Sequence, residues 1–132
     1  MNFHSMNLRL ILIAVFSHFL LFSASCQVAD TNAVSNDQFK QILKEKDVTI
    51  LDVRTTEEFK DGHIENAIHN DVLQTEAFKK FITTLPKDQT YLLYCKSGKR
   101  SANALAIMKE MGFANVKHLQ NGITGWDGTI IK

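Results

Sequence analysis

The sequence has almost no net charge and few histidines, and these shortages remove two classes of function. Its 15 lysines and arginines are balanced by 14 aspartates and glutamates, which leaves a formal charge of +1 at pH 7. Proteins that bind nucleic acid carry a clear excess of positive charge, so this balance gives no indication of a nucleic-acid partner. Of the 5 histidines, those beyond residue 60 show no metal-ligand spacing, and we therefore expect no metal site.

The chain also lacks internal repeats and low-complexity segments. Its 132 residues are enough for one domain. Hydrophobic residues make up 45% and charged residues 22%, a balance typical of a folded protein and not of a disordered one.

No apolar stretch has the length of a comfortable membrane helix, which needs about 20 apolar residues. The longest one covers residues 10–22 and is interrupted by two polar side chains. Arg9 precedes it, and the small residues 23–25 follow it. A cation, a short apolar segment and a small-residue exit are typical of a secretory signal, which we predict over residues 1–25.

The ending Ser23-Ala24-Ser25-Cys26 resembles that of a bacterial lipoprotein signal. In that family the cysteine becomes the lipidated first residue of the mature protein. The resemblance implies a lipidated Cys26, a polar tether over residues 26–34 and a folded domain over 35–132. It further implies a protein of the bacterial cell envelope, anchored to a membrane and facing the periplasm. An ordinary signal that is cut nearby and an uncleaved anchor are the alternatives.

The chain has only two cysteines, Cys26 and Cys95. Two cysteines in an exported protein are usually a disulfide. If Cys26 carries lipid, however, its sulfur is blocked and Cys95 has no partner. Because an unpaired thiol in an oxidising compartment is exposed to oxidation, its presence then indicates a chemical role.

From residue 35 onward, short apolar runs alternate with helical patterns. The expected strands cover 48–51, 64–69, 91–94 and 116–119, and the expected helices 35–46, 55–62, 75–85 and 101–111. This alternation predicts an α/β domain with a central, mostly parallel sheet and helices on both faces. Ligands of such sheets bind beyond the carboxyl ends of the strands, where Asp52, Arg54 and Cys95 lie.

Cys95 stands between an apolar strand and a helical pattern that begins at Ser101. The loop between them contains Gly98 and three cations, Lys96, Lys99 and Arg100. Backbone N–H groups, a helix start and nearby cations lower the pKa of a thiol and produce a nucleophilic thiolate. The loop residues Lys96, Ser97, Gly98, Lys99, Arg100 and Ser101 would also attract an anionic substrate. We therefore expect an enzyme with one nucleophilic cysteine.

Asp52 and Arg54 are expected to support this loop from the neighbouring strand. Asp52 suits a backbone turn or a strand-end cap. The guanidinium of Arg54 suits an internal ion pair with Glu57, Glu58 or another carboxylate.

Three stretches match a known family in order and at fitting distances. They are Asp52-Val53-Arg54 with Glu58-Phe59 and Gly62-His63-Ile64, then residues 94–101, and then residues 116–119 with Asn121-Gly122 and Trp126. On these residues the chain resembles a single-domain rhodanese, a sulfurtransferase, from about residue 35 to the end. Asn66-Ala67 and Asn121-Gly122 replace the family's usual Gly-Ala and Gly-Gly. Both changes are mild, because Asn tolerates positive φ.

The resemblance implies a sulfur transfer without a cofactor. The Cys95 thiolate would attack the outer sulfur of a small anionic donor such as thiosulfate, release sulfite and become a persulfide. A thiol or cyanide would then accept the sulfur, and a thiol-redox protein is a further candidate partner. In the family, the residue that matches Arg100 meets the substrate, and Lys96 belongs to the rim.

Two other functions are alternatives at this point. Cysteine-dependent phosphatases and arsenate reductases also place a nucleophilic cysteine after a strand, but the usual phosphatase signature has arginine six positions later. That position is Ser101, and Arg100 comes one residue early, which makes a smaller cradle. A binding module with this fold but without catalysis is the third possibility, and the presence of Cys95 counts against it.

Overall fold

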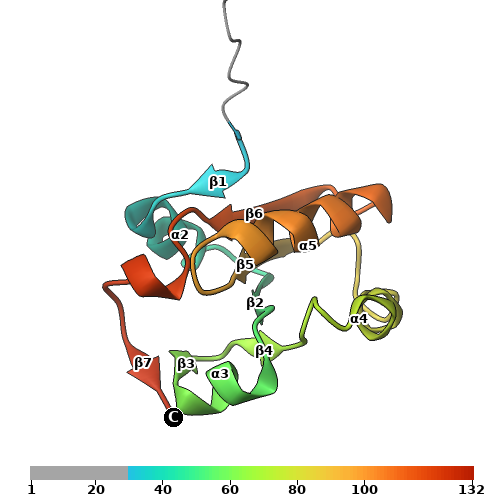
Figure 1. Ribbon diagram of the computed structural model, residues 1–132. Helices are drawn as coiled ribbons and strands as arrows, with labels where there is room; N and C mark the ends of the chain where they lie inside the picture. Colours follow the sequence, from blue (N-terminus) through green and yellow to red (C-terminus); the bar gives the residue numbers. More distant parts are fainter. Residues whose placement is uncertain (1–29) are drawn as a thin grey trace, which may run out of the picture.

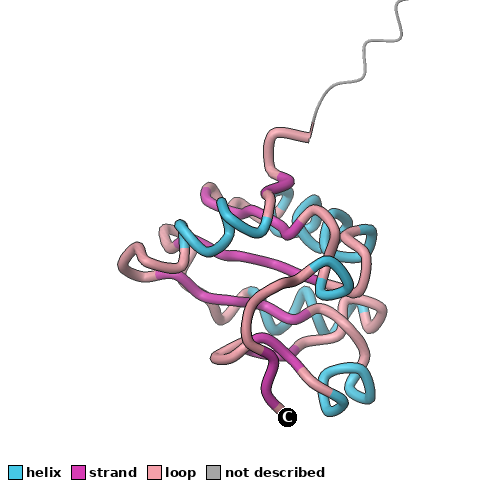
Figure 2. Tube along the Cα trace, turned by 90° about the vertical axis from the view of Figure 1, so that its left-hand side faces the viewer, coloured by secondary structure: helices cyan, strands magenta, loops and turns pink. Residues whose placement is uncertain are grey.

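The computed structural model describes residues 30–132 (Figure 1). The expected signal peptide and Cys26 therefore lie outside the described residues. The centre of the fold is a five-stranded, all-parallel sheet with the order β1-β6-β5-β2-β4. Its strands are β1 (Ala33–Val34), β2 (Val48–Asp52), β4 (Ile68–His69), β5 (Thr90–Tyr94) and β6 (Asn115–Leu119). Figure 2 shows these strands running alongside one another.

Helices connect the strands, as the alternating pattern predicts. They are α2 (Asn36–Ile42), α3 (Thr56–Asp61), α4 (Thr75–Ile82), α5 (Lys99–Glu110) and the short 3₁₀ turn η1 (Ile123–Gly125). A second, antiparallel pair joins β3 (His63–Ile64) to β7 (Ile130–Ile131), beside α3 and away from the main sheet (Figure 1). In the described part of the chain, no helix has both the length and the apolar content to cross a membrane.

The two faces of the sheet have separate apolar cores, because alternate side chains of a strand point to opposite faces. On one face, residues of α4 and α5 pack against the sheet; they include Phe78, Ile82, Leu105 and Met108, with Leu51, Leu93 and Cys95 beneath them. On the other face, α2 and η1 pack against the sheet through Phe39, Ile123 and Trp126, with Ile50, Leu92 and Tyr94 beneath them. The predicted fold class, a parallel α/β sheet covered on both faces, is confirmed.

The first strand lies where the sequence pattern predicts a tether. Ala33 and Val34 pair with His118 and Leu119 of β6, so the sheet includes two residues that precede Ser35. Their pattern is too short to indicate a strand. They form a strand because the edge of β6 presents backbone N–H and C=O groups that need hydrogen-bond partners.

The predicted strand over 64–69 is instead two short strands. Asn66, at φ 64°, makes a turn between β3 and β4, and these strands join different sheets. Helix α5 also begins earlier than the pattern indicates, at Lys99 and not at Ser101. Gly98 adopts a left-handed conformation, φ 99°, that lets the chain leave the loop and enter the helix at once.

The carboxyl ends of β2 and β5 lie side by side at the point where the chain changes direction across the sheet. After β2 the chain continues to β4 on one side, and after β5 it continues to β6 on the other. Such a switch point is where open α/β sheets bind their ligands. Asp52 and Tyr94 are register partners there, and Cys95 follows directly.

Candidate active site

Cys95 is held at the end of the central strand, with 1% of its surface exposed. Its Sγ accepts a hydrogen bond from the amide of Gly98 at 3.1 Å. The chain can turn back toward the sulfur only because residue 98 is glycine: a Cβ there would lie 2.1 Å from the carbonyl oxygen of Gln120. The loop that follows Cys95 therefore covers the thiol.

The surroundings of Cys95 favour the thiolate. Burial by itself raises the pKa of the Cys95 thiol. Hydrogen bonds from the Ser101 hydroxyl and from the amides of Ser101, Gly98 and Ser97 outweigh this effect, and the pKa falls below the ordinary cysteine value. The expected nucleophile thus depends on the Ser101 hydroxyl and on the backbone amides of the loop.

Ser101 is buried in the first turn of α5. Its Oγ donates to the carbonyl of Gly98 at 3.0 Å and lies 3.2 Å from Nδ1 of His118. The opposite nitrogen of this ring, Nε2, lies 2.9 Å from Oδ2 of Asp30. The sequence pattern does not indicate this connection, since His118 and Asp30 are 88 residues apart.

Arg100 projects from α5 to α3, where it forms a two-pronged ion pair with Glu58. Nη1 and Nη2 donate to the two carboxylate oxygens at 2.7 and 2.8 Å. The pair is about a quarter exposed, 24% for Arg100 and 28% for Glu58. The hydrogen bonds from Arg100 lower the pKa of Glu58 to about 2. Arg100 therefore lies at the rim of the loop, and its positive charge is paired with the carboxylate of Glu58.

Three other side chains of the loop are directed toward solvent. Lys96, Ser97 and Lys99 are exposed. The segment after β6 holds the backbone of the loop through two hydrogen bonds. The amide of Ile123 donates to the carbonyl of Cys95 at 2.8 Å, and the amide of Thr124 donates to the carbonyl of Lys96 at 3.1 Å. The cations contribute positive potential around the loop, while its shape comes from backbone contacts.

Asp52 and Arg54 pair with each other. Nε and Nη2 of Arg54 donate to the Asp52 carboxylate at 3.0 and 2.6 Å, and Nη2 also donates to the carbonyl of Gly62 at 2.8 Å. The prediction of an internal ion pair for Arg54 is confirmed, but its partner is neither Glu57 nor Glu58. Geometry explains this, because Glu58 faces Arg100 and caps α3 at Thr55.

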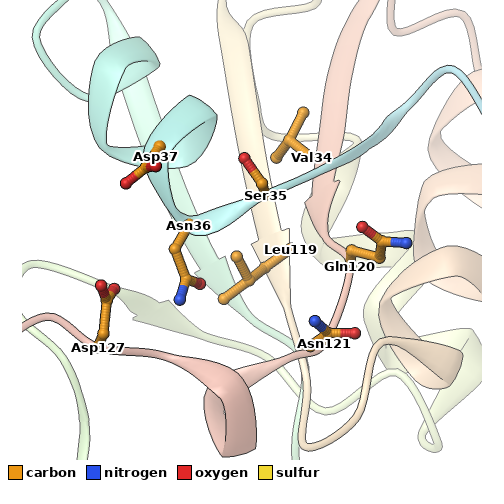
Figure 3. A pocket seen from close by; sticks show the side chains of 8 residues that line it. All are labelled: Val34, Ser35, Asn36, Asp37, Leu119, Gln120, Asn121 and Asp127. Carbon is orange, nitrogen blue, oxygen red and sulfur yellow. The ribbon is translucent and has the colours of Figure 1, made fainter.

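A hollow of about 280 Å³ lies between the start of α2 and the segment that follows β6 (Figure 3). Its walls come from residues 34–37, residues 119–121 and Asp127. None of the predicted site residues lines it, although Gln120, one of its lining residues, lies against Gly98 of the Cys95 loop. Within residues 30–132, no group of three or more His, Cys, Asp or Glu side chains is arranged to hold a metal ion.

These features define a class of protein: a parallel α/β domain whose central strand delivers one activated thiol into a loop lined by backbone amides. Comparison with known families then identifies the particular one. The model of the rhodanese-like domain family matches residues 35–129, and the chain belongs to this family.

Several curated relatives carry sulfurtransferase names. The chain is 31% identical over 96 residues to a sulfurtransferase from Allochromatium vinosum, an overlap of 72% of this chain and 87% of that protein. It is 40% identical over 81 residues to the probable adenylyltransferase/sulfurtransferase MoeZ of Mycobacterium tuberculosis. That overlap covers 60% of this chain and 20% of MoeZ, so the chain matches about one fifth of that larger protein.

Solved structures of the family share the fold. A crystal structure of a rhodanese-like domain protein from Staphylococcus aureus superposes with a TM-score of 0.66 at 26% identity. The overlap covers 76% of this chain and 96% of that one. The relatives together support a rhodanese-type sulfurtransferase.

Proposed function

We propose that this protein transfers a sulfane sulfur from a small anionic donor, such as thiosulfate, to a thiol or cyanide through a persulfide on Cys95. The observation that carries the proposal is the environment of the sulfur. The buried Sγ of Cys95 accepts a hydrogen bond from the Gly98 amide at 3.1 Å, and the nearby donors of Ser101, Gly98 and Ser97 lower the pKa of the thiol. The family relationship supports the same reaction.

In the first step, the Cys95 thiolate attacks the outer sulfur of thiosulfate. A new S–S bond forms at Sγ, the bond to the sulfonate sulfur breaks, and its electron pair leaves with sulfite. The product carries negative charge one atom beyond Sγ, and we expect the loop amides near Sγ to stabilise it. Preorganised amide donors stabilise such developing charge without reorganisation.

In the second step, the acceptor thiolate or cyanide attacks the terminal sulfur of the persulfide. The Cys95 thiolate is the leaving group, and the enzyme returns to its starting state. Because the lowered pKa of Cys95 makes it a good leaving group, one feature serves both steps. A covalent intermediate of this kind predicts ping-pong kinetics.

Arg100 is the loop side chain that would meet the donor, as the resemblance to the family implies. It lies at the rim and holds Glu58 through two hydrogen bonds. A divalent anion such as thiosulfate would compete with the Glu58 carboxylate for the same guanidinium. Lys96 and Lys99 are exposed and would raise the local concentration of anions.

The decisive experiment is mass spectrometry of the full-length chain after brief incubation with thiosulfate. We expect the peptide that contains Cys95 to gain one sulfur atom, and cyanide to remove it. Cys95→Ser should gain none, because a hydroxyl is a poor sulfur nucleophile, and Thr84→Ala, at an exposed position outside the loop, should load like the wild type. Thermal unfolding of Cys95→Ser checks that the fold is intact. A folded wild type with reduced Cys95 and no sulfur gain would defeat the proposal, and arsenate and an aryl phosphate would be assayed next.

We also propose that the protein works in the bacterial cell envelope, anchored through lipid on Cys26 and facing the periplasm, where a thiol-redox protein would be a natural acceptor. The support is the signal-like sequence of residues 1–26. Cys26→Ala should move the chain from the membrane fraction to the soluble fraction. An unchanged distribution would contradict the lipid anchor.

A further inference from the structure

The positive charge of Arg100 is paired with a carboxylate from another part of the chain. Arg100 extends from α5 to α3, where Nη1 and Nη2 donate to Oε2 and Oε1 of Glu58 at 2.7 and 2.8 Å. A two-pronged pair of this kind engages two nitrogens of the guanidinium at once. The pair is 24% and 28% exposed, so solvent screens it only in part. An anion that binds Arg100 must therefore share the guanidinium with Glu58 or displace it.

Glu58 is held in this position by a second set of contacts. Its Oε2 accepts a hydrogen bond from the amide of Thr55 at 3.1 Å, and its own amide donates to Oγ1 of Thr55 at 3.3 Å. This reciprocal pair of bonds caps the start of α3. The hydrogen bonds from Arg100 lower the pKa of Glu58 to about 2, so the carboxylate keeps its negative charge near neutral pH.

Asp71 adds a second carboxylate to the field at Arg100. It follows β4, and its Oδ1 accepts a hydrogen bond from the amide of Leu73 at 2.9 Å. The pKa of Arg100 is raised above the ordinary arginine value, first by the hydrogen bonds to Glu58 and further by the negative charges of Glu58, Cys95 and Asp71. The guanidinium thus lies within reach of the charge on the sulfur, but carboxylates oppose its effect.

A sulfur donor that enters this site meets a cation whose charge is already neutralised. The other cations of the loop, Lys96 and Lys99, are exposed, where water and salt screen them. Repulsion from a carboxylate grows in proportion to the charge of the donor, so a dianion suffers twice as much as a monoanion. We propose that Glu58 is a specificity-determining residue: through its pair with Arg100 it selects against the second negative charge of a donor. The site then favours singly charged sulfane donors, such as thiosulfonates and the persulfides of small thiols.

This inference rests on the proposed sulfur transfer and names its class of donor. Two donors with the same reactive bond separate the classes by charge: thiosulfate is a dianion, and methanethiosulfonate has a methyl group in place of a charged oxygen. With either donor, the Cys95 thiolate attacks the terminal sulfur and a new S–S bond forms at Sγ. The electron pair of the broken bond leaves with sulfite or with methanesulfinate. The negative charge of the thiolate remains on the persulfide.

The test measures the rate at which Cys95 gains sulfur from each donor in the full-length chain, by mass spectrometry of the peptide that contains Cys95. We expect Glu58→Gln to load about tenfold faster from thiosulfate but only about threefold faster from methanethiosulfonate, because the lost repulsion scales with donor charge. The ratio of the two rates therefore rises about threefold. Intrinsic differences between the donors cancel, since the ratio is compared between variants.

The two members of the pair should act in opposite directions. Arg100→Gln should lower the ratio, because the carboxylate of Glu58 then lacks its cation. The double variant of Glu58→Gln and Arg100→Gln replaces a neutral pair by two neutral side chains, so its ratio should return close to that of the wild type. Asp71→Asn keeps an oxygen for the amide of Leu73 and should raise the ratio by less than Glu58→Gln. A purely structural role of the pair would not produce shifts of opposite sign.

Glu57→Gln is the matched control, because Glu57 is an exposed residue of the same helix, and its ratio should equal that of the wild type. Alkylation of Cys95 by iodoacetamide, an uncharged reagent, checks the thiol in each variant. An unchanged ratio in Glu58→Gln would overturn the inference, as would a double variant with a ratio as low as that of Arg100→Gln. If Glu58→Gln does not fold, Asp71→Asn and Arg100→Gln decide by the direction of their shifts.

Failure of the proposed sulfur transfer gives a different result. A folded wild type whose Cys95 reacts with iodoacetamide but gains sulfur from neither donor would refute the transfer and this inference with it. A wild type that loads from both donors, with the same ratio in Glu58→Gln, would refute this inference alone.

Discussion

The carboxyl ends of β2 and β5 lie next to each other and use their polar groups in opposite ways. At the end of β2, the buried carboxylate of Asp52 meets the buried guanidinium of Arg54, whose Nη2 lies 2.6 Å from Oδ2. At the end of β5, Cys95 is just as buried, but its sulfur accepts a hydrogen bond from a backbone amide, that of Gly98, and uncharged donors of the loop lower the pKa of its thiol. Among the described residues, no buried side-chain nitrogen or oxygen lacks a hydrogen-bond partner.

This difference shows how one edge of a sheet can be rigid and reactive at once. The charges of Asp52 and Arg54 pair with each other, so this pair does not present a charged group to a ligand. The amides around Cys95 are directed at a single sulfur, and they retain their dipoles when a second sulfur or an anion arrives. The ion pair of Arg100 with Glu58 connects the two regions, because α5 follows β5 and α3 follows β2.

The largest effect should come from breaking the closed pair. Arg54→Met leaves the Asp52 carboxylate buried without a cation, and we expect a loss of about 3–5 kcal/mol in the free energy of unfolding. Urea unfolding followed by circular dichroism measures this loss. The fraction that is folded should still take up sulfur at Cys95, because Arg54 does not bond to it.

Lys79→Met is the matched control for that change. Lys79 is 45% exposed and lies 3.6 Å from an exposed Glu76, so its removal should cost about 0.5 kcal/mol or less. In addition, Asp52→Asn introduced into Arg54→Met should recover part of the lost stability, since the isolated charge is then gone. Equal stability of Arg54→Met and Lys79→Met would contradict the role given to the buried pair.

A smaller effect should follow from a side chain that forces the amide-lined loop away from its neighbours. Gly98→Ala places a Cβ 2.1 Å from the carbonyl oxygen of Gln120 at a φ of +99°. We expect a loss of roughly 2–3 kcal/mol in the free energy of unfolding, together with slower alkylation of Cys95 as the amide moves away from the sulfur.

Gly112→Ala separates the two causes. Gly112 has a similar φ, +93°, but a Cβ there meets only the end of the Lys87 side chain at 3.5 Å. It should show the strain of the left-handed conformation alone, about 1 kcal/mol, with unchanged alkylation of Cys95. If both variants slow alkylation equally, the close approach of Gly98 to Gln120 is not what shapes the loop.

The smallest effect concerns the pair that connects the two regions. Because Arg100 lowers the pKa of Glu58 from 4.5 to about 2, the pair stabilises the folded chain above pH 4.5. This contribution is lost as the pH falls toward about 2. Glu58→Gln should therefore cost about 1 kcal/mol at pH 7 and converge with the wild type near pH 2, as measured by urea unfolding across this range.

Glu57→Gln serves as the comparison, since Glu57 is an exposed neighbour on the same helix. It should follow the wild-type stability at every pH. Glu58→Gln still offers an oxygen to the amide of Thr55, so a difference between the two variants reports the charge and not the helix cap. A constant offset between Glu58→Gln and the wild type down to pH 2 would contradict the assignment.

Features that depend on neighbours in the sequence were predictable. Ser35 and Thr55 cap their helices through bonds to residues three positions later, and Gly62 ends α3. The succession of strand, cysteine, glycine-containing loop and helix is equally local, and it places Cys95 at the end of β5. The periodic patterns that predict these elements reflect backbone geometry within one or two turns.

Features that depend on a distant partner were not predictable in the same way. Ala33–Val34 and Ile130–Ile131 become strands only because β6 and β3 present free edges. Arg54 pairs with Asp52, while Glu58 turns to Arg100, 42 residues away. In a short stretch with several charges, composition does not show which side chains face each other.

The sequence by itself determined the alternation of strands and helices, the place of the thiol and the glycine that lets the loop close, since each follows from local backbone preference and the spacing of apolar residues. Only the tertiary structure decided which donors surround Cys95 and which charges pair. It brings Asp30, Ser101 and His118 into one line, because hydrogen bonds and ion pairs depend on distances of about 3 Å that sequence separation does not encode.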